Sequence, residues 1–198
     1  SSSAGLGISL SCSDTSIAKI SNGQISLVGV GTVQITASQT GNDNYNPAAN
    51  ISRSFSVLSS VKIKYQNGDN STINNQIKPF LTLFNESNHA IPYNELTVKY
   101  WFTPENYSGI NSWIDYAALG NSNVKMSYTN LATPRNNTLG YVEYSFLAAA
   151  GNLGANANSG VIQSRFANTD WSDLNEQNDY SWTNTNTSVY VNNITVYR

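Results

Sequence analysis

The feature that most constrains the fold of this chain is a series of short segments in which apolar and polar residues alternate. Clear examples are residues 32–37, 96–102, 141–146 and 161–166. Gly, Asn, Asp and Pro separate these segments, and no stretch sustains the 3.6-residue periodicity of an amphipathic helix. Alternation with a period of two turns one face toward a core and the other toward solvent. Many short strands with frequent turn signals predict an all-β protein built from sandwiches.

Charge and hydropathy argue against two classes of partner. The 198 residues include 11% charged side chains and carry a formal net charge of −2, with no basic stripe, so nucleic acid is not expected. No apolar run approaches the roughly 20 residues that span a bilayer, so no membrane partner is expected either. The polar residues are mainly Asn, Ser, Thr and Tyr, a bias that favours a secreted, extracellular protein. The abrupt start in Ser and Gly indicates a piece of a longer chain.

A change in composition near residues 58–60 divides the sequence. The part before it is rich in Gly, Ser and Thr and has few aromatic residues, whereas tryptophan and frequent tyrosine occur only after it. Segments with such different aromatic content require separate cores. We therefore expect a first domain over residues 1–58, a linker at residues 59–60 and a second domain over residues 61–198.

The first segment has the pattern of a small β-domain, with glycines that turn the chain between short strands. Val33, Ile35 and Ala37 alternate onto one face of an expected strand. In four stretches the segment resembles a bacterial immunoglobulin-like domain: residues 13–20, 29–37, 41–46 and 53–57. The opening strands of such a domain are missing. The resemblance thus implies a small, truncated immunoglobulin-like β-sandwich of reduced stability, acting as a spacer.

Three motifs occur in order in the second segment. Residues 96–103 read Leu-Thr-Val-Lys-Tyr-Trp-Phe-Thr, residues 113–120 read Trp-Ile-Asp-Tyr-Ala-Ala-Leu-Gly, and residues 162–182 contain Gln-x-Arg-Phe, Asp-Trp-Ser and Asn-Asp-Tyr-Ser. With these motifs the segment resembles the family 3 carbohydrate-binding modules of cellulosomal scaffoldins and secreted cellulases. The resemblance implies a nine-stranded jelly-roll β-sandwich with a structural calcium ion (Ca²⁺) and a flat face for crystalline cellulose or a related β-glucan. It also implies anchoring of a larger secreted polysaccharide-degrading protein, with a catalytic domain on the same longer chain.

Crystalline cellulose dictates the side chains that such a face needs. Its sugar rings present apolar C–H faces, which aromatic rings cover, and hydroxyl rims, which planar polar groups reach. Trp171 is the first expected stacking ring, because it lies in a polar turn where a core tryptophan would be poorly covered. The resemblance adds Tyr116 as a second ring, and Asp115 with Arg165 as a planar ion pair on which a sugar can lie.

Further residues extend or limit this face. Gln163 lies two residues before Arg165, so in a strand it points to the same side and is a weaker polar anchor. The alternatives are structural: Trp171 could cap one end of the sandwich, and Tyr116 could be an ordinary half-buried strand residue. The short loop at residues 120–124 lacks a further surface tyrosine that is usual in the family, which predicts weaker or shifted binding. Three other tryptophans are expected to pack in the core: Trp101, Trp113 and Trp182.

The calcium ion that the resemblance implies has candidate ligands in two loops. Ca²⁺ takes roughly six to eight oxygen ligands from carboxylates, amides and carbonyls. One loop supplies Asn175, Asn178 and Asp179, and the other supplies Thr103 and Glu105. Glu105 stands where the family usually has Asp. The alternative is a hydrogen-bonded loop without metal.

Catalysis is not expected. A glycoside hydrolase requires two carboxylates across a cleft, and here the best acidic cluster is explained by calcium. The sequence shows no Ser-His-Asp set, HExxH motif or phosphate loop. Two further hypotheses are a catalysis-assisting module packed on a glycoside hydrolase domain, and a spacer or adhesion module without a carbohydrate ligand. The residues do not separate cellulose from chitin or xyloglucan, which have similarly flat backbones.

Overall fold

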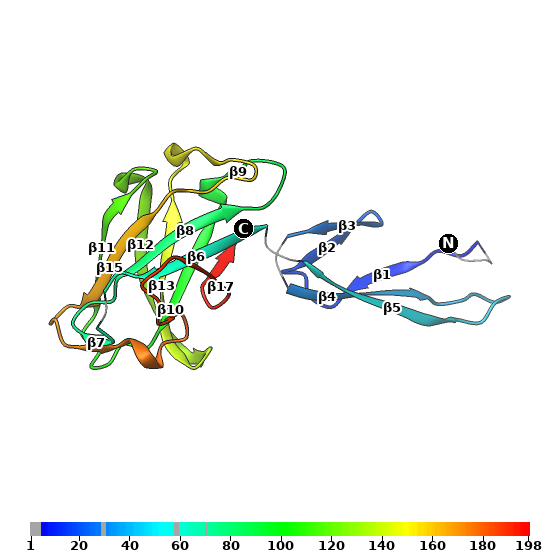
Figure 1. The fold of residues 1–198 in the computed structure, drawn as a ribbon. Helices are drawn as coiled ribbons and strands as arrows, with labels where there is room; N and C mark the ends of the chain where they lie inside the picture. Colours follow the sequence, from blue (N-terminus) through cyan, green and yellow to red (C-terminus); the bar gives the residue numbers. More distant parts are fainter. Residues whose placement is uncertain (1–4, 29–30, 58–59, 70) are drawn as a thin grey trace. The chain divides into compact units, whose positions relative to one another are not determined.

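The computed structural model describes residues 5–28, 31–57, 60–69 and 71–198 (Figure 1). The chain divides into two compact units, Ser1–Ser59 and Ser60–Arg198. The division falls inside the predicted linker, of which Ser59 lies outside the described residues. Within the described part of the chain, all helical segments are short 3-10 turns, so the all-β prediction is confirmed. No described helix is long and apolar enough to cross a membrane.

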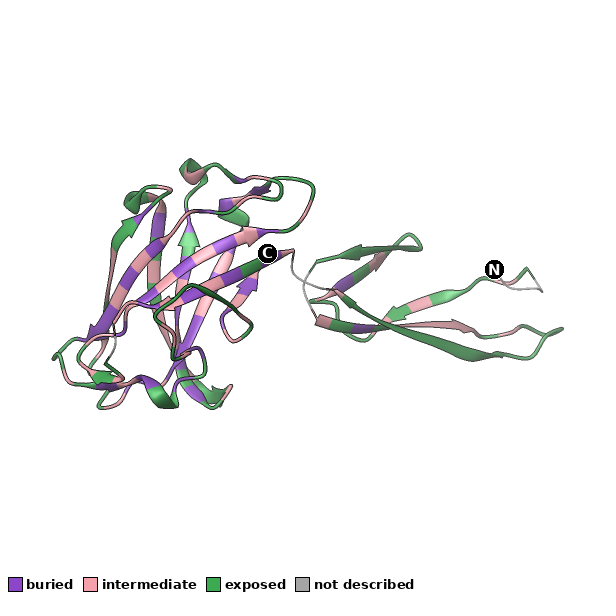
Figure 2. Ribbon diagram, in the orientation of Figure 1, coloured by how far each residue is buried: buried purple, intermediate pink, exposed green. Residues whose placement is uncertain are grey.

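The first unit is a small β-structure with few buried side chains. It has an antiparallel sheet in the order β1-β4-β5 and a β2-β3 hairpin. Its strands are β1 (Ser9–Cys12), β2 (Ala18–Ser21), β3 (Gln24–Leu27), β4 (Gly31–Gln39) and β5 (Ala48–Val57). Among the described residues of this unit, only Ala18 and Val33 are buried apolar side chains, and β5 is exposed along most of its length (Figure 2). So little burial provides little hydrophobic stabilisation. The immunoglobulin-like interpretation stays a prediction.

The second unit is a sandwich of two antiparallel sheets. The strand orders are β12-β13-β10-β18 and β11-β15-β8-β6-β17. The first sheet consists of β10 (Thr97–Phe102), β12 (Val124–Arg135), β13 (Thr138–Phe146) and β18 (Thr195–Tyr197). The second consists of β6 (Val61–Asn67), β8 (Pro79–Asn85), β11 (Ile110–Ala117), β15 (Ile162–Asn168) and β17 (Val189–Val191). Neighbouring strands are mostly distant in sequence, as jelly-roll connections require.

Short elements complete the second unit around the two sheets. Four two-residue strands form two small antiparallel pairs, β9 with β14 and β7 with β16. These strands are β7 (Ile73–Asn74), β9 (Ile91–Pro92), β14 (Asn152–Leu153) and β16 (Leu174–Asn175). The 3-10 turns are η1 (Tyr93–Glu95), η2 (Asn121–Asn123), η3 (Ala148–Ala150) and η4 (Glu176–Asn178).

One apolar core lies between the two sheets. In β6, β8 and β13 buried residues alternate with more exposed ones, as Figure 2 shows, because successive side chains of a strand point to opposite faces. Trp101 is buried, with 1% of its surface exposed, but on the opposite face of β10 from Tyr100 and Phe102, which belong to the core cluster. Its indole Nε1 donates a hydrogen bond to Thr195 at 2.9 Å, and its ring centroid lies 4.9 Å from that of Tyr141. Trp182, in contrast, is only half-buried.

Candidate functional site

The paired strands β11 and β15 position four candidate side chains on the outer face of their sheet. In β15 the even-numbered residues 162, 164 and 166 are buried, so Gln163 and Arg165 point outward. Trp113 of β11 pairs with Arg165, and Tyr116 pairs with Gln163. Directly opposite residues of two antiparallel strands share one face. The two strands thus bring these side chains together, although they lie some fifty residues apart in the sequence.

A bulge in β11 turns two consecutive residues outward. The register with β15 shifts between Ile114 and Tyr116, which leaves Asp115 as an extra residue. Such an insertion bends the strand and re-aims the neighbouring side chains. Asp115 and Tyr116 are both exposed, Tyr116 to 49%. Regular alternation would place them on opposite faces, so the bulge is the reason that both lie beside Arg165 and Gln163.

Arg165 connects the ionic and aromatic parts of this face. Its Nε donates to both carboxylate oxygens of Asp115, at 3.0 and 3.1 Å. Its guanidinium carbon lies 4.6 Å from the centre of the Trp113 ring. The predicted pair is therefore present, although it uses one nitrogen rather than a fork of two. Because exposed ion pairs stabilise folding by at most about 1 kcal/mol, its main effect is to fix the plane of the guanidinium.

Trp171 stands on a tight turn that follows β15. Its φ is +59°, and its backbone N–H donates to the Asn168 carbonyl at 3.0 Å. The Thr169 hydroxyl ties the same turn to the Ser108 carbonyl at 2.6 Å. A left-handed conformation costs a non-glycine residue roughly 1–2 kcal/mol. The side chain is 44% exposed, and its ring stacks on Trp113 with centroids 5.6 Å apart and an angle of 17°.

The prediction that Trp113 packs in the core is wrong. Its side chain is only half-buried and contacts both the Trp171 ring and the Arg165 guanidinium on the outer face. A signal for this position was present in the sequence, because Trp113 precedes Asp115 by two residues in an expected strand. We call the resulting set the outer strip. It consists of Trp113, Asp115, Tyr116, Gln163, Arg165 and Trp171.

Asn121, a residue not predicted from the sequence, holds the bulge in place. Its side-chain oxygen accepts a hydrogen bond from the Ala117 N–H at 2.8 Å. Its side-chain nitrogen donates to the carbonyls of Ile114 and Asp115, both at 3.2 Å. The three bonds bridge the two sides of the bulge. An Asn that follows a Gly in a turn is too common a pattern for sequence alone to assign this role.

The five candidate calcium ligands lie together where two loops meet. The Thr103 N–H donates to Asp179 Oδ1 at 2.8 Å. Glu105 accepts at one carboxylate oxygen from the Asn175 N–H at 3.0 Å, and at the other from the Asn178 side-chain nitrogen at 2.7 Å. Two segments about seventy residues apart are thus connected through Glu105 and Asp179. Around this point the described residues include no cluster of three or more His, Cys, Asp or Glu side chains suited to a metal. Amide and carbonyl oxygens would therefore have to complete any coordination shell.

Several buried oxygens at this junction lack hydrogen-bond partners. They are Asp179 Oδ2, Asn168 Oδ1 and both carboxylate oxygens of Glu176, considering the described residues. Burial raises the pKa of Asp179 to about 9, and burial followed by the nearby charge of Asp69 raises the pKa of Glu176 to about 8. Unpaired buried oxygens are costly and call for a partner. Asp179 Oδ2 and Asn168 Oδ1 fit a hard cation, which prefers such ligands. Neither Asn168 nor Glu176 was predicted from the sequence.

Comparisons with known proteins agree on one family. The sequence model of the family described as "Cellulose binding domain" matches residues 62–198. The chain is 39% identical over 126 residues to an uncharacterized protein in the celA 5′ region of Paenibacillus lautus, covering 64% of this chain and 86% of that protein. It is 35% identical over 144 residues to Endoglucanase A of the same species, covering 72% of this chain but only 20% of that enzyme.

A solved structure shows the same fold. The CBM3 structure from Hungateiclostridium clariflavum is 34% identical in sequence, with a TM-score of 0.65. The alignment covers 69% of this chain and 92% of that one. The second unit thus shares its overall fold with a solved CBM3 module. The chain belongs to the cellulose binding domain family, CBM3.

Proposed function

We propose that the second unit binds the flat surface of crystalline cellulose through the outer strip. The observation that supports this most strongly is the run of contacts from Trp171 to Trp113 to Arg165 to Asp115 on one sheet face. An exposed indole such as that of Trp171 covers the apolar face of a sugar ring, and a planar guanidinium–carboxylate pair meets both ring faces and hydroxyls. Tyr116 and Gln163 extend the strip along β11 and β15. Aromatic burial is expected to provide most of the affinity, and the polar groups the register.

In this proposal, the second unit binds cellulose as one part of a larger protein. The chain covers only a fifth of the related endoglucanase, so in that enzyme a similar module accompanies a much longer polypeptide. We infer that this chain anchors a secreted polysaccharide-degrading protein, which carries the catalytic domain, to its insoluble substrate. The CBM3 family is a family of non-catalytic binding modules, and we assign no catalytic step to this chain. The first unit acts as a spacer.

A structural Ca²⁺ is the second part of the proposal. The residues that would hold it are Glu105, Asp179, Asn175, Asn178 and Thr103, with Asn168 as an added oxygen donor. The unpartnered oxygens of Asp179 and Asn168 support this choice. When bound, the ion would supply a cross-link between the loop after β10 and the loop around η4. It would stabilise the junction of these two loops without taking part in sugar recognition.

A pull-down on microcrystalline cellulose tests the function. The full chain is expected to pellet with cellulose and to stay in the supernatant with granular starch, an α-linked glucan without the same flat surface. Retention by both matrices would indicate nonspecific adsorption. A chain that stays in the supernatant with cellulose would contradict the proposal and favour a spacer or adhesion module.

Asn121 provides a test of how the strip is positioned. Replacing Asn121 with alanine removes three hydrogen bonds at the bulge, and we expect it to destabilise the second unit by about 2 kcal/mol, or roughly 8 °C in melting temperature. Binding to cellulose should weaken several-fold, because Asp115 and Tyr116 lose their fixed orientation. The matched control is Asn123→Ala, which removes one hydrogen bond to the Leu119 carbonyl in the same turn. Equal losses of affinity in the two variants would show that the hydrogen bonds of Asn121 at the bulge have no special role in binding.

A further inference from the structure

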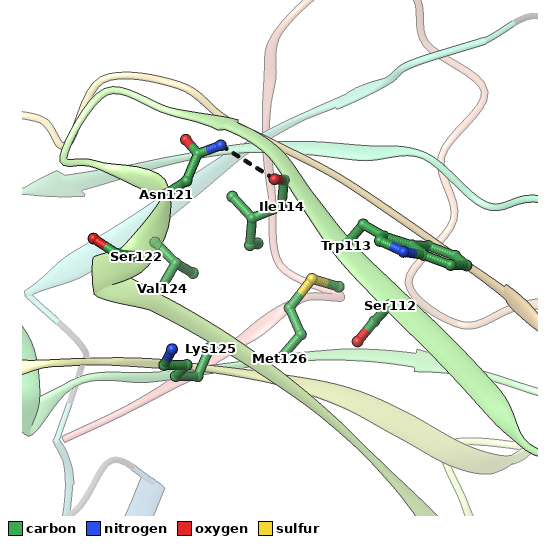
Figure 3. A pocket seen from close by; sticks show the side chains of 8 residues that line it. All are labelled: Ser112, Trp113, Ile114, Asn121, Ser122, Val124, Lys125 and Met126. Carbon is green, nitrogen blue, oxygen red and sulfur yellow. Dashed lines mark hydrogen bonds between the residues drawn. The ribbon is translucent and has the colours of Figure 1, made fainter.

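A cleft opens at the side of the sandwich, next to the outer strip. It lies between β11 and β12, which are the edge strands of the two sheets (Figure 3). Its volume is about 420 Å³, a size within the range of small-molecule sites. Figure 3 shows that three apolar side chains point into the space: Ile114, Val124 and Met126.

The rim of the cleft is polar and nearly free of charge. The hydroxyls of Ser112 and Ser122 and the ammonium group of Lys125 lie around the apolar floor. Lys125 is the one charged residue among the eight that line the cleft. An apolar floor with a few polar groups at its edge matches a sugar ring, which has an apolar face and a hydroxyl rim. The absence of a carboxylate from this lining disfavours a cationic occupant.

The link between β11 and β12 leaves the cleft uncovered. It consists only of residues 118–123, which include the tight turn η2. Ile114 and Met126 therefore stay half-buried, although both also pack against the core. Parts of both side chains thus remain accessible to a ligand in the cleft.

The cleft is continuous with the outer strip through β11. Trp113 belongs to the strip and also borders the cleft, and in Figure 3 its ring points away from the floor. Ser112 and Ile114 on either side of it face the cleft, as the alternation of a strand requires. A glucan chain lying over Trp113 would thus have the cleft along its side, where a group branching from the chain could enter.

We propose that this cleft binds a single sugar ring that branches from a β-1,4-glucan backbone, an inference that rests on the proposed function of the outer strip. The backbone lies on the strip, and the branch enters over the edge of β11. At about 420 Å³ the cleft is large enough for one pyranose ring. The ring packs on Ile114 and Met126, and its hydroxyls meet Ser112, Ser122 and Lys125. The chain therefore prefers decorated glucans over bare ones in solution.

Calorimetry on the full chain tests the preference with two soluble probes. One is a cello-oligosaccharide with single xylose branches, and the other is the unbranched oligosaccharide of the same backbone length. The wild-type chain is expected to bind the branched probe about tenfold more tightly, which corresponds to about 1.4 kcal/mol. Ser112→Phe fills the cleft and should abolish this preference while leaving the pelleting with cellulose unchanged. Ser122→Tyr, which narrows the mouth from the rim, should act in the same direction even if the first variant fails to fold.

The controls separate the cleft from the strip. Ser127→Phe adds the same ring on β12 outside the cleft and should keep the wild-type preference. Equal affinity of the wild-type chain for both probes, together with normal pelleting on cellulose, would overturn the cleft proposal alone. Loss of pelleting by the wild-type chain would overturn the proposed function itself. A dimer in sedimentation that Ser112→Phe dissociates would assign the cleft to a second copy of the chain instead, against the proposal.

Discussion

Replacing Trp171 with alanine is expected to weaken binding to microcrystalline cellulose about thirty-fold, while the second unit stays folded. Trp171 is the larger of the two exposed rings of the outer strip, with 44% of its surface exposed, and its ring stacks on that of Trp113. Central aromatic residues of an interface are worth about 2 kcal/mol or more when truncated, and 1.4 kcal/mol corresponds to a factor of ten. Depletion isotherms at several protein concentrations give the affinity, and circular dichroism shows whether the fold persists.

A glycine at the same position separates the ring from the backbone. Residue 171 has a φ of +59°, which glycine adopts without the steric penalty that alanine meets. Trp171→Gly should therefore bind as weakly as Trp171→Ala but melt at a higher temperature. If the glycine variant kept the wild-type affinity, the ring would not contact cellulose and the outer strip would be misplaced.

Tyr45 provides a matched control for the loss of an exposed aromatic ring. It lies in the first unit and is 54% exposed. Tyr45→Ala is expected to bind cellulose as the wild-type chain does, because we assign the first unit no ligand. An equal loss of affinity in this variant would move part of the binding surface to the first unit and reduce the special role given to the strip.

The sheet faces were predictable because one physical rule controls them. Alternation with a period of two, read from the sequence, places Gln163 and Arg165 on one side of a strand, and the structure has them there. The same rule, applied to Trp113 and Asp115, would have placed Trp113 on the outer face. The resemblance to the family argued instead for a structural, core-packed indole, and it was the weaker guide at this position. The rule fails at Asp115 and Tyr116, because a bulge depends on tertiary pairing that no local pattern announces.

For the candidate calcium site, the sequence predicted which residues lie together but not which of their oxygens are buried without partners. Acidic and amide residues in two loops indicated where a cation would be held, and the five named residues do lie together. The sequence could not reveal that Asn168 and Glu176 have buried oxygens without partners, because burial depends on how β15 and η4 pack against the rest of the unit. Asn121 is a similar case, since its role consists of three hydrogen bonds to a backbone shape. Residues that act through the backbone have little sequence signature.

Removing calcium is expected to lower the melting temperature of the second unit by about 10 °C. A ligand at a hundred times its dissociation constant stabilises the folded state by about 2.7 kcal/mol, and each kcal/mol shifts the melting temperature of a unit of this size by roughly 3–5 °C. Scanning calorimetry of the chain in millimolar calcium, and again with excess EDTA, measures the change. Magnesium should restore little of it, because Mg²⁺ is smaller and demands near-octahedral ligands.

Two neighbouring substitutions identify the carboxylate that matters in this calcium response. Asp179→Asn removes the buried charge that would face the ion, so its melting temperature should be the same with calcium and with EDTA. Asp173→Asn removes an exposed carboxylate of the same stretch and should keep the full calcium response. Equal melting of the wild-type chain in calcium and EDTA would contradict the metal site. In that case the buried oxygens of Asp179 and Asn168 would need another partner, of which ordered water is the simplest, because unpaired oxygens at this depth would otherwise destabilise the fold.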